Sequence, residues 1–270
     1  MPAPSITKAQ ASTNKEYEKS YFDRTFQLDV REPTSRFYSV VDGCRDFYEG
    51  YLLSVCCGKK VLEYGCGKGS SAFFLAENGA STVGIDISEV GISFAREQAA
   101  KRNLHDIDFL AMDAEATEFE DSTYDIVCGT GILHHLRTVP ALKELTRIIK
   151  PEGEAVFIEP LGHNPAINLY RKLTPRFRTK DEHPLVKEDF QSMEAYFGET
   201  RYVFFNLLAL LSVPFRNMRG FPSLVKALAG LDKRLFARVP ALGLFAWQVI
   251  IILKNPRKGL VESPQDQGLK

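Results

Sequence analysis

Apolar and polar positions alternate in blocks along the middle of the chain, and the period of the pattern switches between two and nearly four residues. Short apolar runs predict strands at 59–65, 81–88, 107–113, 124–131 and 154–160. Helical spacing lies between them, at 70–80, 88–103 and 139–150. Strand and helix alternating with short links is typical of a parallel sheet wrapped by helices.

The pattern is different on both sides of this block. Residues 1–14 are polar with two prolines, which favours a flexible lead, whereas aromatic residues recur at helical intervals over 15–54 and predict an N-terminal helical cap broken near Pro33. Further elements are expected downstream: a loop at 161–184, a helix at 186–197, a strand at 199–205, a helical insertion at 206–240, a buried strand at 246–253 and a disordered tail at 256–270. Residues 15–255 thus read as one domain.

Composition narrows the class of protein. The 270 residues are 44% hydrophobic and 25% charged, with 34 Lys+Arg against 34 Asp+Glu, so a phosphate-neutralising nucleic-acid binder is not expected. No run approaches the roughly 20 apolar residues of a membrane-spanning helix, and the N-terminus has no apolar signal core. The five cysteines lack a regular spacing, which favours reduced thiols in a cytoplasmic protein, and no metal site is expected.

Charge is nevertheless uneven along the chain. Residues 161–240 hold 13 Lys or Arg and only 7 Asp or Glu. The apolar segments FNLLALLSVPF and SLVKALAGLDKRLFARV belong to this region. As helices they would carry an apolar face with basic residues beside it, which suits a lid over a lipophilic acceptor, a surface helix on anionic lipid, an ordinary packed insertion or a dimer contact.

A glycine-rich turn follows the first predicted strand, in the sequence EYGCGKG at 63–69. Its glycines allow a sharp turn and let a ligand approach the backbone, and the following helix presents its N-terminal amides there. Asp86 ends the second strand, 21 residues after Gly65, where a carboxylate can accept from a ribose diol. Asp113 ends the third strand and could accept from the exocyclic amine of adenine. A dinucleotide fits less well, because position 70 is serine and Glu63 would repel a pyrophosphate.

These residues resemble a known family. VLEYGCGKG, GIDIS, MDAE and YDIVCGTGILHHL, in this order, are similar to the class I S-adenosylmethionine-dependent methyltransferases, in particular their small-molecule branch. The resemblance covers about 55–160 and implies an α/β, Rossmann-like seven-stranded sheet that is mostly parallel with an antiparallel last strand. Helices on both faces, N-terminal helices and a helical insertion before the last strand complete the expected fold.

The resemblance also implies roles for individual positions. Gly65 and Gly67 would line the methionine portion of the donor, with Glu63 beneath it. Asp86 with Ile87 would hold the ribose. The remaining positions are Asp113 and the amide of Ala114 for adenine, and the carbonyl of Gly129 for the donor's ammonium.

The sequence says less about the residues that bind and activate the methyl acceptor. His134 and His135 follow the fourth strand and His163 follows the fifth, so each is a candidate general base near the ligand edge. The expected reaction is methylation of a small lipophilic or aromatic metabolite, most readily on oxygen, with carbon or nitrogen of a quinone-like or natural-product acceptor as the alternative. An NAD(P)-dependent oxidoreductase and a non-catalytic binding module of the same fold stay as rivals. The chain is expected to act as a monomer or homodimer.

Overall fold

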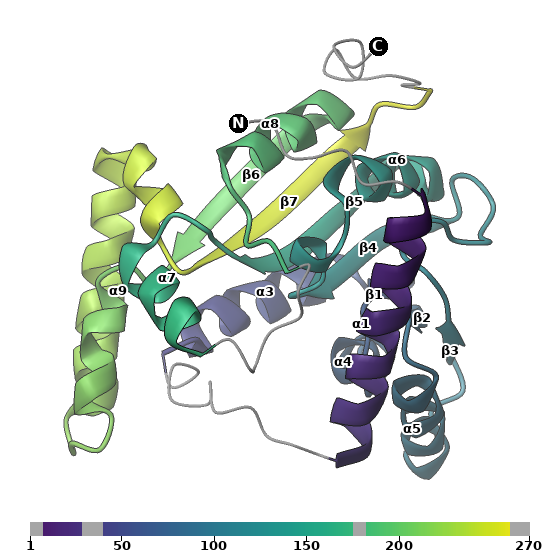
Figure 1. Cartoon of the computed structure of the whole chain (residues 1–270), viewed down its shortest axis with the longest axis horizontal. Helices are drawn as coiled ribbons and strands as arrows, with labels where there is room; N and C mark the ends of the chain where they lie inside the picture. The colour runs from purple at the N-terminus through teal and green to yellow at the C-terminus, as the bar shows by residue number, and fades with distance from the viewer. Residues whose placement is uncertain (1–7, 29–39, 175–181, 260–270) are drawn as a thin grey trace.

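The computed structural model describes residues 8–28, 40–174 and 182–259, which form an α/β fold built on one seven-stranded sheet (Figure 1). The strand order is β3-β2-β1-β4-β5-β7-β6. The strands are β1 Lys60–Tyr64, β2 Ser81–Asp86, β3 Ile107–Ala111, β4 Tyr124–Thr130, β5 Ile149–Pro160, β6 Phe197–Phe205 and β7 Gln248–Pro256. Only β7 runs antiparallel, to both of its neighbours, so the predicted mixed sheet is confirmed.

Helices cover both faces of the sheet. The α-helices are α1 Lys8–Leu28, α3 Asp42–Val55, α4 Ser70–Glu77, α5 Glu89–Lys101, α6 Thr138–Ile148, α7 Pro165–Leu173, α8 Lys187–Tyr196 and α9 Phe221–Arg238. Short 3-10 helices are η1 Leu133–His135, η3 Ala209–Phe215 and η4 Pro240–Phe245. Ser88 caps α5 as its sequence position predicts, because its hydroxyl accepts from the amide of Gly91 at 3.1 Å.

The apolar side chains of the strands point to both faces of the sheet, and both faces pack against helices. One face packs against α6 and α8 through buried strand residues that include Leu62, Tyr64, Val127, Phe157 and Ile251. The other face packs against α3 and α4 through Val61, Ile126, Cys128, Val156 and Ile250. Since both faces are covered, the carboxyl edge of the parallel strands is left as the place where loops can build a site.

Helix α1 is longer than the sequence suggested. It begins at Lys8, inside the range 1–14 expected to be a flexible lead, because no proline or glycine interrupts the chain between Lys8 and Leu28. Figure 1 shows α1 lying beside α5 at the β1–β3 half of the sheet. Residues 1–7 and the break expected near Pro33 lie outside the described residues. So does most of the expected tail, from residue 260 on.

The segment expected to be a loop at 161–184 contains a helix, so that prediction was wrong. Asn164 caps α7 by accepting from the amides of Ala166 and Ile167 at 3.0 and 3.1 Å, and Pro165 takes the first helical position. The Asn-Pro pair is thus the start signal of a helix in a stretch whose mixed composition suggested a loop.

The expected insertion is present between β6 and β7. It consists of η3, α9 and η4, and α9 stands at the opposite end of the molecule from α1 (Figure 1). β6 runs parallel to β5, so the insertion leaves the sheet at the same carboxyl edge as the glycine-rich turn. Over the described ranges, no helix combines the length and apolar character needed to span a bilayer.

Candidate active site

The turn after β1 has a backbone that requires glycine. Gly65, Gly67 and Gly69 have φ of 63°, 51° and 91°, in the region that side chains rarely adopt. A Cβ at Gly65 would lie 2.8 Å from Cδ1 of Ile132, and one at Gly69 would lie 2.7 Å from the ring of Phe73. The turn therefore lies tightly between η1 and α4, and it leads directly into the first turn of α4.

Glu63 lies under this turn at the end of β1 and is 1% exposed. Its carboxylate accepts from the amides of Ser71 and Ala72 at 3.2 and 2.7 Å, so it caps the N-terminus of α4. Burial raises the pKa of Glu63 to about 7, against the opposing effect of these amides. The structure thus gives Glu63 the task of orienting α4, and the contact with a donor remains a prediction.

The raised pKa of Glu63 predicts a pH-dependent stability. Between pH 4.5 and about 7 the unfolded chain has lost the proton that the folded chain keeps, so the free energy of unfolding should fall as pH rises. The expected slope is at most about 1.4 kcal/mol per pH unit. Urea unfolding of the wild type and Glu63→Gln over this range measures it, and Glu77→Gln on the exposed end of α4 is the control. Parallel curves for the wild type and Glu63→Gln would contradict the assignment.

Asp86 ends β2 beside the glycine turn, and Asp113 lies in the loop that follows β3. The two carboxylate oxygens of Asp86 accept from the amides of Gly67 and Ser88, each at 2.8 Å, and burial raises its pKa. Ile87 follows it between β2 and the cap of α5. Asp113 accepts from the amide of Glu115 at 2.9 Å and forms an ion pair with Lys15 of α1.

Two further predicted positions complete this edge. Ala114, next to Asp113, is buried. Gly129 lies in β4, opposite Tyr64 of β1 and Phe157 of β5. A Cβ there would lie 2.9 Å from the carbonyl oxygen of Tyr64, so the strands approach too closely for any side chain. The structure therefore gathers the predicted donor-binding residues at the carboxyl ends of β1 to β4.

Helix α1 lies across this edge, which the sequence reasoning missed. Lys15 pairs with Asp113 and, at 2.8 Å, with Glu115. Asp23 accepts from the hydroxyl of Ser88, and the ring of Phe26 lies 3.2 Å from where a Cβ of Gly67 would be. Lys15, Lys19 and Asp23 recur every four residues on one helix face, and this spacing was the available signal.

Two histidines lie together after β4, each beside a carboxylate. Nδ1 of His134 lies 2.7 Å from Oε2 of Glu159, and Nδ1 of His135 lies 2.9 Å from Oε1 of Glu18 in α1. The two ring centroids are 4.2 Å apart. Burial lowers the pKa of His134 although Glu159 opposes this effect. Burial would also lower the pKa of His135, but the hydrogen bond and charge of Glu18 outweigh it and the pKa is raised.

The other histidines have different partners. Nε2 of His163 accepts from the amide of Lys187 at 3.2 Å, and its ring lies 6.3 Å from that of Phe245 in η4. The backbone amide of His183 donates to the carbonyl of His134 at 2.8 Å, so its loop lies against η1. His105 is exposed. Among the described residues, no three His, Cys, Asp or Glu side chains are grouped so that they could hold a metal ion.

Glu159 of β5 is a further residue of this edge that the sequence analysis did not predict. It is fully buried in β5 and accepts from the amides of Ile132 and Leu133 at 2.9 and 2.7 Å as well as facing His134. One carboxylate thus fixes both the start of η1 and the ring of a candidate base. Its signal was a lone acid in the apolar run AVFIEP, since a charge in a buried strand needs partners.

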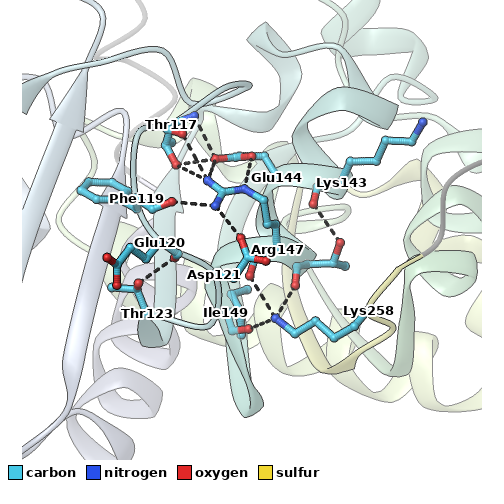
Figure 2. A network of polar contacts seen from close by, with 11 residues as sticks. Thr117, Phe119, Glu120, Asp121, Thr123, Lys143, Glu144, Arg147, Ile149 and Lys258 are labelled. Atoms are coloured by element: carbon cyan, nitrogen blue, oxygen red, sulfur yellow. Dashed lines mark hydrogen bonds and ion pairs between the residues drawn. The ribbon is translucent and has the colours of Figure 1, made fainter.

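The loop that carries Asp113 is anchored from the other side by Arg147 of α6 (Figure 2). The guanidinium donates to the carbonyl of Phe119 at 2.6 Å, to Asp121 at 2.8 Å and to both oxygens of Glu144 at 2.7 and 3.0 Å. These contacts, first that with Glu144, raise its pKa. Lys258 closes the end of α6 by donating to backbone carbonyls there. The β3–β4 loop is therefore held at its far end by charged hydrogen bonds.

Sheet order, glycine turn and strand-end acids together define the fold of class I methyltransferases. Residues 61–153 match a family model described as a methyltransferase domain. This part of the chain, about a third of its length, is therefore similar to the methyltransferase domain of the class I S-adenosylmethionine-dependent enzymes, whose methyl donor is S-adenosylmethionine.

Similar proteins act on different acceptors. Ubiquinone biosynthesis O-methyltransferase of Neisseria meningitidis is 33% identical over 128 residues, covering 46% of this chain and 52% of that protein. Phosphoethanolamine N-methyltransferase 3 of Arabidopsis thaliana is 32% identical over 127 residues, covering 45% and 26%. The chain thus spans about half, or less, of the length of these relatives.

A solved structure extends the likeness in fold over most of the chain. Geranyl diphosphate C-methyltransferase of Streptomyces coelicolor, a complex with Mg²⁺, geranyl diphosphate and S-adenosyl-L-homocysteine, superposes with a TM-score of 0.60 at 12% identity. The match covers 90% of this chain and 98% of that one. At this identity the likeness concerns the fold alone, and it includes the regions outside the matched methyltransferase domain.

Proposed function

We propose that this chain transfers the methyl group of S-adenosylmethionine to a small lipophilic or aromatic metabolite, most readily to an oxygen. The observation that carries the proposal is the convergence of a side-chain-free turn, Asp86 and Asp113 on one sheet edge. The turn leaves room that a Cβ would fill, and two carboxylates lie at the same edge. This arrangement suits an adenosine ligand with a cationic centre, and it suits a negatively charged pyrophosphate poorly.

Each residue has a role in this proposal that follows from its place. Gly65 and Gly67 bring the backbone close to the methionine portion, while Glu63 holds the first turn of α4 in place by accepting from the amides of Ser71 and Ala72. Asp86 uses one lone pair of each oxygen on backbone amides and keeps others for the ribose hydroxyls, beside Ile87. The remaining contacts are Asp113 and the Ala114 amide for adenine, and the Gly129 carbonyl for the ammonium.

Methyl transfer requires that donor and acceptor are aligned and, for a phenolic acceptor, that a base removes a proton. When bound, the donor supplies a methyl group on a sulfonium, and the neutral thioether that departs when the methyl is transferred is a good leaving group. Holding two reactants in line lowers the barrier by about 7–11 kcal/mol. His134 is the favoured base, because its lowered pKa keeps the imidazole neutral and Glu159 fixes the ring by its Nδ1. His135 is paired to Glu18 of α1, and its raised pKa keeps the ring protonated to a higher pH, so less of it is free to accept a proton.

The acceptor is inferred from the insertion. η4 reaches the segment after β5, where Phe245 lies near His163 and its carbonyl accepts from Asn164 at 2.7 Å. An apolar side chain of the insertion next to a candidate base supports a lipophilic acceptor. Incubating the protein and labelled donor with a metabolite extract, then identifying the labelled product, tests the acceptor and the accepting atom. A labelled polar metabolite such as a phosphorylated amine would contradict the lipophilic assignment.

Donor binding has its own test in Asp86→Asn, which keeps the size of the side chain and one acceptor oxygen. Loss of a charged hydrogen bond costs about 1.5–3 kcal/mol, so the Kd for S-adenosylhomocysteine should rise about 10- to 150-fold by calorimetry. Asp108→Asn, at an exposed position of β3, is the matched control. An unchanged Kd in folded Asp86→Asn would show that the ribose lies elsewhere. Binding of NAD in place of S-adenosylhomocysteine would favour the oxidoreductase alternative.

A further inference from the structure

The insertion presents a surface on which every exposed charge is positive. Residues 206–245 contain six basic side chains and a single acid. The basic residues are Arg216, Arg219, Lys226, Lys233, Arg234 and Arg238, and all but the half-buried Arg216 are exposed. None of the six forms an ion pair with any residue in the described ranges. We call residues 206–245 the basic-apolar surface.

The single acid, Asp232, is buried within the insertion. It is 3% exposed, and its carboxylate accepts from the amides of Leu207, Leu208 and Ala209 at 3.1, 2.8 and 3.2 Å. This side chain therefore ties α9 to the segment that begins η3. It is directed inward and does not balance the cations, so the positive charge of the basic-apolar surface faces solvent without compensation.

Large apolar side chains are exposed on the same surface. Leu211 is 63% exposed and Met218 is 61% exposed, at the end of the η3–α9 hairpin together with Phe215 at 47%. Of the twelve large apolar side chains that are exposed in the described residues, the surface holds six, which also include Leu231, Val239 and Phe245. Clustered exposed apolar groups beside unpaired cations indicate an interaction site.

Helix α9 arranges these groups along its length. Leu224, Leu228, Leu235 and Phe236 are half-buried on its inner side, whereas Lys226, Lys233, Arg234 and Arg238 are exposed on its outer side. Its 18 residues give a length of about 27 Å. Figure 1 shows α9 as the outermost element beyond the β6 end of the sheet, so this side is accessible along the whole helix.

We propose that the basic-apolar surface binds a membrane that contains anionic lipids, with α9 lying along the plane of the headgroups. Cations near such a surface are attracted to its negative charge, and apolar side chains beside them enter the interface. A nucleic acid would use the cations but would leave Leu211, Phe215 and Met218 in water. A second copy is disfavoured because two faces of the same positive charge would repel one another. The proposal does not depend on the methyl-transfer activity.

Vesicle flotation with the full chain tests this proposal. Binding is expected to vesicles of equal phosphatidylcholine and phosphatidylglycerol, and not to phosphatidylcholine alone. Replacing Lys226, Lys233, Arg234 and Arg238 by Gln should lower the partition coefficient at least about tenfold. A control variant removes the same charge elsewhere, by Gln at Arg45, Lys59, Lys101 and Arg201, and should bind as the wild type does. Thermal unfolding of both variants checks that they are folded.

A second variant tests the apolar contribution. Phe215→Ser with Met218→Ser should weaken binding to the anionic vesicles even though no charge changes, and binding of the wild type should decrease with added salt. Equal binding to neutral and anionic vesicles, equal losses in both Gln variants or no flotation would overturn the proposal. So would a fluorescent duplex oligonucleotide that binds in place of the vesicles, or a dimer in sedimentation velocity that the α9 variant abolishes.

Discussion

Replacing His134 by Gln is expected to lower kcat for methyl transfer by about 10²- to 10⁴-fold, the usual contribution of a general base. The ring is 7% exposed, and its Nδ1 is held by Glu159, so its Nε2 is the nitrogen available for the acceptor's proton. Glutamine can still donate to Glu159 but cannot take a proton. The measurement is the initial rate with labelled donor and the acceptor that the extract screen identifies.

The pH profile separates this role from a structural one. Because burial lowers the pKa of His134 below its ordinary 6.5, wild-type kcat should be flat at neutral pH and decline only as pH falls through the lowered pKa. His134→Gln should lack this decline while its Kd for S-adenosylhomocysteine stays unchanged. His105→Gln, at an exposed position, is the control. If kcat fell in His163→Gln and stayed at the wild-type value in His134→Gln, the base would be His163, which follows β5.

Replacing Glu159 by Ala is expected to lower the free energy of unfolding by at least about 1–3 kcal/mol, the cost of leaving a buried donor without its acceptor. The carboxylate is fully buried and serves two amides of η1 and the ring of His134, all of which would lose their acceptor. Urea unfolding measures the change, and Glu159→Gln, which keeps one acceptor oxygen, should lose less.

The matched control lies on the same strand. Glu152 is exposed in β5, so Glu152→Ala should change the unfolding free energy by no more than about 0.5 kcal/mol. A loss at Glu159 no larger than at Glu152 would show that η1 does not depend on the carboxylate. Together with the pH profile of His134→Gln, this comparison distinguishes a role of Glu159 in positioning η1 and His134 from a role in filling space.

The sheet and its donor-side edge could be predicted from the sequence because their signals are local. Period-two runs predicted the strands, and the parallel order brings the carboxyl ends of β1, β2 and β3, followed by Gly65, Asp86 and the loop of Asp113, to one edge of the sheet. Helix α7 has an equally local signal in Asn164 and Pro165, which the polar composition around it obscured. The prediction of a loop was wrong because the composition of the segment was given more weight than the helix-capping signal of these two residues.

Other features depend on contacts between distant parts of the chain. The ion pair of Lys15 with Asp113 joins residues 98 apart, and Glu159 meets amides 26 and 27 residues earlier in the sequence. A helical face in α1 shows that the helix will pack, but the surface on which it packs depends on the tertiary fold. The partners of a buried acid are likewise set by which loop the strand order brings to its end.

The ion pair between Lys15 and Asp113 bears on how a donor affinity should be interpreted. If adenine takes Asp113 as proposed, its amine has to exchange with an ammonium that the carboxylate already holds. The measured free energy of donor binding is then a net value. It equals the free energy gained by the contact of adenine with Asp113 minus the free energy lost when the Lys15–Asp113 ion pair is broken. Shortening or tagging the N-terminal end would alter that balance without touching any residue that contacts the ligand.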